Sequence, residues 1–116
     1  MGSIRKNLLI SGLPATAFSS ATRTFDAMDV TNYKTVGVQV DVVGGGSTGT
    51  GKLQWSINGT VFEDIPAANA TTIAIAGTNS YYMQAINLGC AQVRVSITST
   101  NGTNITVTGT MIGKEF

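Results

Sequence analysis

The strongest constraint on the fold is the strict alternation of valine with other residues in the segment TVGVQVDV. Successive side chains of a β-strand point to opposite faces, so a period of two produces one apolar face and one polar face. Strands with one buried and one solvated face are typical of antiparallel sheets. The buried face is predicted to consist of Val36, Val38, Val40 and Val42, with Gly37, Gln39 and Asp41 on the other face.

The rest of the chain repeats this pattern in short runs that are separated by turn residues. Asn-Gly pairs favour tight hairpins because both residues accept a positive φ, and they occur at Asn58–Gly59 and Asn101–Gly102. With a first strand at Ile4–Ile10, we expect about eight or nine strands, at the spacing of a sandwich or barrel. The predicted fold is therefore all-β, a jelly-roll-like antiparallel β-sandwich. The remaining strands are predicted in KLQWSI, TVFEDI, TTIAIAG, SYYMQAI, CAQVRVSIT and TNITVTGTMI.

Composition narrows the classes of partner. Charged residues make up 11% of the 116-residue chain and the net charge is +1, whereas an average protein has about 25% charged residues. The chain therefore lacks the basic surface that binds nucleic acid or an anionic membrane. Because a surface with so little charge resists self-association weakly, we expect it to be covered in an assembly.

The N-terminal region is predicted to be a strand followed by an extended arm. A basic pair, a short apolar run and the triplet ATA imitate a signal peptide, but Ser11 and Gly12 interrupt the apolar run. We therefore expect no targeting signal and no membrane span. The length fits one domain, with residues 1–34 as the N-terminal strand and arm and residues 35–116 as the sandwich body.

The segment GGGSTGTGK contains the spacing of a phosphate-binding loop. Gly46, Gly51 and Lys52 satisfy the pattern G-x-x-x-x-G-K. Such a loop requires Ser or Thr after the lysine to bind Mg²⁺, and it opens a helix that receives the phosphate. This chain has Leu53 after the lysine and a strand pattern that carries Trp55. The segment is therefore predicted to be a glycine-rich connection between strands.

The chain contains one cysteine, Cys90, and no histidine. An intrachain disulfide and a Cys/His metal site are therefore excluded, and we expect no bound metal or cofactor. A nucleophilic cysteine needs a base, which histidine usually supplies. Cys90 is predicted to be a small buried residue at the start of a strand.

The acidic residues form no recognisable catalytic pair. Glu63 and Asp64 are adjacent, so they point to opposite faces of a strand, whereas glycoside hydrolysis needs two carboxylates across one cleft. Arg94 is expected on the outward face of its strand, with pairing to Glu63 or Asp64 across an interface as the alternative. We predict no enzymatic activity and no catalytic residues. Four Asn-x-Thr triplets are attributed to turn chemistry rather than to glycosylation, at Asn58, Asn69, Asn101 and Asn104.

The aromatic residues leave one functional alternative open. Trp55, the only tryptophan, alternates with Leu53 and Ile57 and is predicted to pack in the core. If it were exposed, it would instead offer a stacking platform for a sugar. Tyr81 and Tyr82 are adjacent and point to opposite faces of a strand, so one is expected in the core and the other at a surface contact.

The order of these segments resembles that of small β-sandwich structural proteins of bacteriophage virions. In those proteins a hairpin with the pattern L-Q-x-S-x-(D)-G-T-x-W/F-x-D-I precedes a Y-x-x-V-R-V strand. The match covers residues 35–113, with Ile57 and Asn58 in place of the usual Asn-Asp before the glycine. The matching residues are Leu53, Gln54, Ser56, Gly59, Thr60, Phe62, Asp64 and Ile65 in the hairpin and Val93, Arg94 and Val95 in the strand.

The resemblance implies a role in the virion, as a capsid decoration, cement, vertex or fibre protein, and it carries over no catalytic residues. The expected partners are phage capsid or tail proteins and further copies of the chain in a trimer or ring. Residues 1–34 lie outside the resemblance and are expected to reach a neighbouring subunit. The alternative, from another class, is a carbohydrate-binding module in which Trp55 is exposed.

We expect the glycine-rich segment to bind no nucleotide, because Leu53 offers no hydroxyl group for Mg²⁺. Calorimetric titration with Mg-ATP should show only the heat of dilution, and Lys52→Ala should leave assembly unchanged. Micromolar ATP binding that disappears in the Lys52→Ala variant would contradict this interpretation of the segment.

Overall fold

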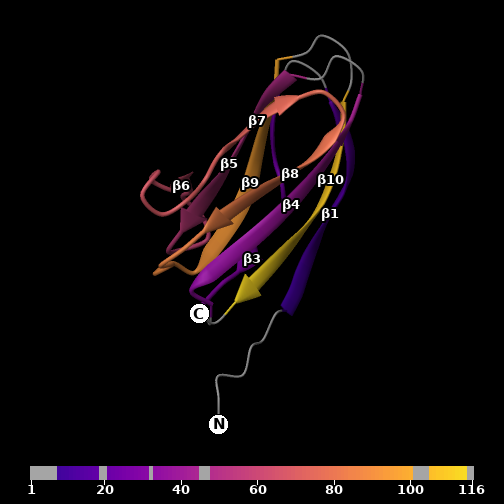
Figure 1. Ribbon diagram of the computed structural model, residues 1–116. Helices are drawn as coiled ribbons and strands as arrows, with labels where there is room; N and C mark the ends of the chain where they lie inside the picture. Colours follow the sequence, from indigo (N-terminus) through magenta and orange to yellow (C-terminus); the bar gives the residue numbers. More distant parts are fainter. Residues whose placement is uncertain (1–7, 19–20, 32, 45–47, 101–104, 115–116) are drawn as a thin grey trace.

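The computed structural model describes residues 8–18, 21–31, 33–44, 48–100 and 105–114, with the backbone alone in the first range. These residues form ten strands and no helix (Figure 1). The strands are β1 (Leu8–Phe18), β2 (Thr22–Thr24), β3 (Met28–Asp29), β4 (Thr35–Val43), β5 (Thr48–Ser56), β6 (Glu63–Asp64), β7 (Ile73–Ala76), β8 (Asn79–Ala85), β9 (Gln92–Ser99) and β10 (Ile105–Lys114).

The strands form two antiparallel sheets that pack face to face, which confirms the predicted β-sandwich (Figure 1). One sheet has the order β1-β10-β4-β8. In the other, β9 lies between β5 and the short strands β2 and β3, while β6 and β7 pair with the far side of β5. The chain changes sheet at six of the nine connections between these strands, so that the four long strands β1, β10, β4 and β8 of one sheet are not consecutive in the sequence.

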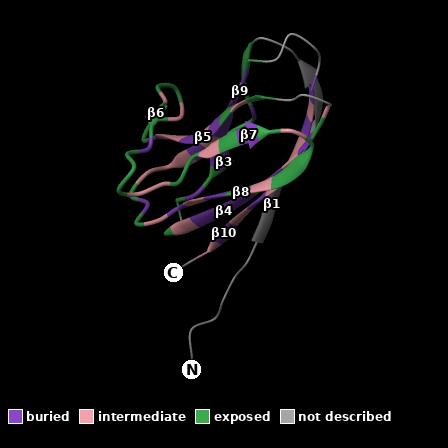
Figure 2. Cartoon of the chain, turned by 45° about the horizontal axis from the view of Figure 1, so that its top comes forward, coloured by how far each residue is buried: buried purple, intermediate pink, exposed green. Residues whose placement is uncertain are grey.

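The core lies between the two sheets and is built by the alternating strands (Figure 2). All four valines of β4 that the sequence assigns to the apolar face are at most 2% exposed. The inner face of β9 lies opposite, and its residues are equally buried. Alternation along these two central strands therefore supplies the two halves of the core. The fully buried residues at its centre are Val36, Val38, Val40, Val42, Val93, Val95 and Ile97.

The N-terminal region belongs to the sandwich in this structure, which differs from the predicted division at residue 34. β1 pairs with β10, and β2 and β3 pair with β9. Phe25, Met28 and Val30 are buried in the common core. The physical reason is that these apolar residues fill the core while the N-terminal strands cover the edges of β9 and β10. Of the predicted first strand Ile4–Ile10, only residues 8–10 lie within the described residues, and the strand continues to Phe18.

The Asn58–Gly59 pair does not form the tight hairpin that the sequence predicts. Gly59 has a φ of 78°, but Asn58 does not have a positive φ, and the strands on either side pair only from Trp55 and Glu63 onward. Asn58 instead organises a wider loop through its side chain. The second pair, Asn101–Gly102, lies outside the described residues. It connects β9 to β10, which belong to different sheets, so the predicted hairpin between these two strands is wrong.

Gly49 and Gly51, which precede Lys52, allow close packing within a sheet. β5 begins at Thr48 and pairs with both β7 and β9. A Cβ atom at Gly49 would overlap the carbonyl oxygen of Thr98, and one at Gly51 would lie 2.7 Å from the side chain of Ile73. Thr48–Gly51 thus belongs to β5, so the predicted connection is shorter than the sequence indicates, and Lys52 is followed by strand rather than by the helix that a phosphate-binding loop opens.

Gly49→Ala should destabilise the fold, because its new methyl group meets a main-chain atom that can move only with β9. We expect a loss of about 1–3 kcal/mol in the free energy of unfolding, the range for overpacked sites. Gly89→Ala is the matched control, since a Cβ atom there has no neighbour within 4 Å, and it should change stability by less than about 0.5 kcal/mol. Urea denaturation followed by Trp55 fluorescence measures both. Equal stability of the two variants would contradict the close approach of β5 and β9.

Candidate functional site

Trp55 lies at the rim of the core rather than inside it. Its indole is partly buried and packs against the core cluster, and its neighbours across the sheet are Val93 on one side and Glu63 on the other. Leu53 is fully buried, whereas Ile57 is 83% exposed. The predicted face of Leu53, Trp55 and Ile57 therefore passes from core to solvent, because β5 ends at Ser56 and the chain then leaves the sandwich.

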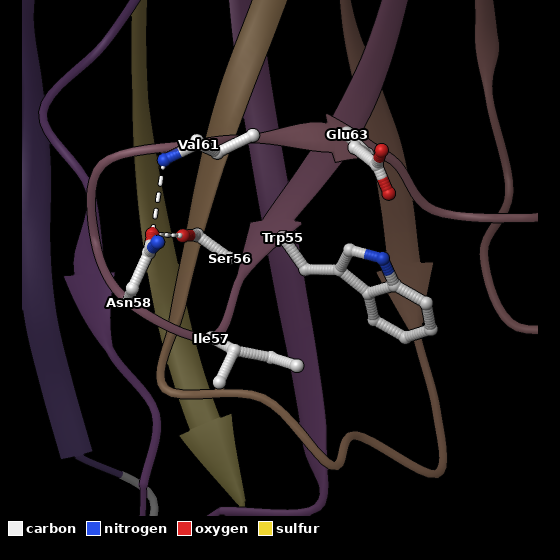
Figure 3. A pocket seen from close by; sticks show the side chains of 6 residues that line it. All are labelled: Trp55, Ser56, Ile57, Asn58, Val61 and Glu63. Carbon is white, nitrogen blue, oxygen red and sulfur yellow. Dashed lines mark hydrogen bonds between the residues drawn. The ribbon is translucent and has the colours of Figure 1, made fainter.

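Two hollows flank Trp55 and Ile57, and both residues line both of them. Figure 3 shows the first, with Glu63 on the side toward which the nitrogen edge of the indole is turned. It has a volume of about 240 Å³ and is lined by Trp55, Ser56, Ile57, Asn58, Val61 and Glu63. The second has a volume of about 340 Å³ and is lined by Trp55, Ile57, Asn87, Gly89 and Cys90. We call the two together the Trp55 groove.

The loop beside the first hollow is held by side-chain hydrogen bonds. Asn58 Oδ1 accepts hydrogen bonds from the backbone N–H groups of Thr60, at 2.8 Å, and Val61, at 3.0 Å. It also accepts one from the hydroxyl of Ser56 at 3.1 Å, and Ser56 Oγ in turn accepts the N–H of Gly59 at 2.8 Å. The loop thus has a defined shape although it is largely exposed. Sequence patterns did not predict this role of Asn58. Asparagine side chains often accept hydrogen bonds from backbone N–H groups two or three residues ahead, and this tendency could have indicated it.

On the outer face of the sheet that contains β5 and β9, a chain of polar side-chain contacts holds β6 against β5. Arg94 Nε donates to Gln54 Oε1 at 2.8 Å, and Gln54 Nε2 donates to Asp64 Oδ1 at 2.9 Å. Lys52 forms an ion pair with Asp64 at 2.9 Å, and the Arg94 guanidinium lies 4.1 Å from the ring centre of Phe62. Arg94 is on the outward face as predicted, and it reaches Asp64 through Gln54 within the chain.

The side chains of Glu63 and Asp64 lie on opposite faces of β6, as expected for adjacent residues of a strand. Glu63 lines the Trp55 groove, whereas Asp64 belongs to the polar chain with Lys52 and Gln54. The hydrogen bond from Gln54, followed by that from Lys52, holds the pKa of Asp64 below its usual value. The structure does not bring the two carboxylates together across a cleft.

The other candidate residues have mainly structural surroundings. Cys90 is partly buried, and this burial raises the pKa of its thiol, which disfavours the nucleophilic thiolate. Tyr81 packs against the core and donates its hydroxyl to the Gly77 carbonyl at 2.9 Å. Tyr82 is 56% exposed, on the opposite face, and its ring lies over Gly37. The expected split between a core tyrosine and a surface tyrosine is therefore observed.

Two of the four Asn-x-Thr triplets lie within the described residues, and both have structural contacts. Asn58 organises its loop, and Asn69 Nδ2 donates to the carbonyl of Ile86 at 3.2 Å. Asn101 and Asn104 lie outside the described residues. Across the described part of the chain, no three His, Cys, Asp or Glu side chains gather as metal ligands, and no helix has the length and apolarity to span a membrane.

Comparison with known proteins shows the fold. No protein-family model and no curated protein sequence matches this chain. Among solved structures, YomS, derived from the SPBc2 prophage, matches over 97% of this chain and 98% of its own, with a TM-score of 0.51 and 15% identity. Bacillus endospore appendages, which form disulfide-linked pili, match over 94% of this chain and 84% of theirs, with a TM-score of 0.56 and 13% identity.

The PBSX exported protein XepA also contains this sandwich. It matches over 96% of this chain but 37% of its own length, with a TM-score of 0.60 and 12% identity. At identities this low, the shared property is the β-sandwich. The resemblance to small β-sandwich proteins of phage origin is confirmed at that level.

Acidification should destabilise the fold through three aspartates whose pKa values are lowered by hydrogen bonds. The donors are Thr31 to Asp29, Ser80 and then Gln39 to Asp41, and Gln54 and then Lys52 to Asp64. A folded-state pKa below that of the unfolded chain means that the unfolded chain binds protons first. Stability is therefore fully present above the unfolded pKa of about 3.9 and falls as the pH drops through the lower folded-state values.

Urea denaturation at pH 6, 4 and 3 would measure this loss for the native chain and for Asp64→Asn. The variant should lose less stability than the native chain between pH 6 and pH 3, because one of the three groups no longer titrates. An identical loss in both proteins would contradict the contribution of Asp64.

Proposed function

We propose that this chain is a non-enzymatic structural protein of a bacteriophage virion, which binds capsid or tail subunits and further copies of itself. The observation that carries the proposal is the match of the whole sandwich to prophage-derived YomS, over 97% of this chain and 98% of that one. The virion-like pattern of the hairpin and of the Val93-Arg94-Val95 strand supports it independently of the fold. Within the virion, we propose a capsid decoration, cement or vertex position.

The surface of the chain is consistent with a protein that is covered in an assembly. Among the residues whose side chains the structure describes, four large hydrophobic ones are exposed, including Val43 and Tyr82 on the outer face of the β1-β10-β4-β8 sheet. The charged residues that would keep copies apart are few. We infer that part of this face is covered by capsid or tail subunits.

Self-assembly has a specific candidate surface, the outer edge of β1. β8 forms the opposite edge of the same sheet, but residues 69–71 cover part of it: Thr71 N–H donates to the Gln84 carbonyl, and Gln84 N–H donates to the Thr71 hydroxyl, each at 2.9 Å. The edge strands of the other sheet are two to four residues long, whereas β1 has eleven residues and pairs with β10 alone among the described strands. A long edge is a template for a strand from another molecule.

We therefore expect the purified protein to form a stable homo-oligomer, a trimer or a ring, through the N-terminal segment. Light scattering at tens of micromolar should give a mass above that of one 12.0 kDa chain. Removal of residues 1–20 should reduce this mass, with circular dichroism as the control for folding. A monomeric full-length protein would contradict self-assembly, and an unchanged oligomer after truncation would place the interface on strands of the sandwich other than β1.

The virion role has its own test, a mass-spectrometric inventory of purified phage particles from a strain that carries this gene. The proposal expects the chain among the particle proteins at a fixed ratio to the major capsid subunit. Its absence from purified particles, together with its presence in the infected cell, would overturn the proposal.

A further inference from the structure

We propose that the Trp55 groove binds a neutral saccharide, with Trp55 as the stacking surface and Glu63 as the acceptor for sugar hydroxyl groups. The groove combines apolar side chains with a small number of polar groups at the end of a rigid sheet. This composition is typical of small-molecule sites, which are concave, mainly apolar and fixed by a few polar contacts. The proposal does not depend on the virion role.

Trp55 has the position that stacking requires. One part of its indole packs against the core and is thereby held in place, while the rest lines hollows on both sides. Ile57 and Val61 extend the apolar surface and are 83% and 62% exposed. A pyranose ring presents C–H groups on its faces, and an aromatic ring fixed at the rim of a sheet can contact them at little cost in side-chain entropy.

A hydrogen-bond acceptor and a hydrogen-bond donor both lie beside this apolar surface. Glu63 is exposed, and its carboxylate bonds to none of the described residues; it can accept two hydroxyl hydrogen bonds. The carbonyl oxygen of Asn58 is occupied by three donors of its own loop, and its amide nitrogen donates to none of the described residues. The groove thus offers an acceptor and a donor, and a sugar hydroxyl can use both.

The charge of the groove selects for a neutral ligand. Glu63 is the one charged side chain in the lining of either hollow. The two nearby cations have other contacts, because Lys52 pairs with Asp64 and Arg94 bonds Gln54 and covers Phe62. A phosphate, a sulfate or an acidic sugar would meet an uncompensated carboxylate, so neutral hexoses are favoured over anionic ones.

The loop that contains Asn58 is preorganised for ligand binding. The hydrogen bonds of Ser56 and Asn58 set its backbone, and the polar chain through Asp64 sets β6. Little conformational entropy is then lost when a ligand enters. A shallow site of this size should bind weakly, and an assembly that displays many copies would bind a glycan-coated surface by avidity.

The single tryptophan makes the test direct, because all tryptophan fluorescence comes from the proposed site. The full chain would be screened on an array of neutral glycans, and hits such as lactose, maltotriose or chitotriose would be titrated by fluorescence. We expect saturable change with a dissociation constant of about 1 mM. If lactose binds, 3′-sialyllactose, which adds a negative charge, should bind more weakly. The absence of any neutral ligand on the array would overturn the proposal.

Glu63→Gln tests the role of the carboxylate with a side chain of the same shape. Because Glu63 is exposed and bonds to none of the described residues, the variant should fold normally, and its affinity should fall about tenfold or more, as expected when a charge-assisted hydrogen bond is weakened. Asp26→Asn removes an exposed carboxylate outside the groove and is the matched control. Equal affinity of Glu63→Gln and the native chain would overturn the assignment of Glu63.

Trp55→Phe tests whether the indole itself contributes to saccharide binding. Its binding would be measured by calorimetry, with circular dichroism to confirm the fold, since the variant lacks the fluorophore. We expect weaker binding with the fold retained. Undiminished affinity in this variant would show that the indole is not needed for binding and would overturn the assignment of Trp55 as the stacking surface.

Discussion

The structure depends on the burial of two alternating faces against each other, those of β4 and β9. Each is the inner side of a central strand, with neighbours on both edges, and its residues are shielded almost completely from water. Burial of a valine or isoleucine side chain contributes about 1.5–3 kcal/mol, so this one contact supplies a large part of the driving force for folding. The outer faces and the ends of the sandwich are therefore free to carry other functions.

The sequence predicts this core well because the information is local. A period of two along β4 identifies the buried valines without any knowledge of the partner strand. Long-range pairing is different: β1 pairs with β10, with Leu8 opposite Gly113, and no local pattern states that register. For this reason the sequence predicts a strand and an arm over residues 1–34, whereas the structure places β1, β2 and β3 in the two sheets.

The candidate site shows a second limit of sequence patterns. Alternation assigns Trp55 to the inner face correctly, but it does not say how far along the strand the opposite sheet continues. Leu53 is covered by that sheet, Trp55 reaches its rim and Ile57 lies beyond it. The Asn58–Gly59 pair has the same ambiguity, since its residue types suit both a tight hairpin and the wider loop that Asn58 stabilises through its side chain. Trp55, which the local pattern assigns to the core, and Asn58, which it assigns to a tight turn, thus line the same groove.

Polar contacts hold β6 at a place where the fold has little apolar burial to stabilise it. β6 has two residues, and contacts from Lys52, Gln54 and Arg94 hold it on the sheet. This arrangement keeps Glu63 beside Trp55. The outer edge of β1, which has no partner among the described strands, belongs to the other sheet, and β1 and β6 lie on opposite sides of the molecule in Figure 1. Assembly along β1 would therefore leave the Trp55 groove accessible, and a ligand in the groove would not compete with the contacts between copies.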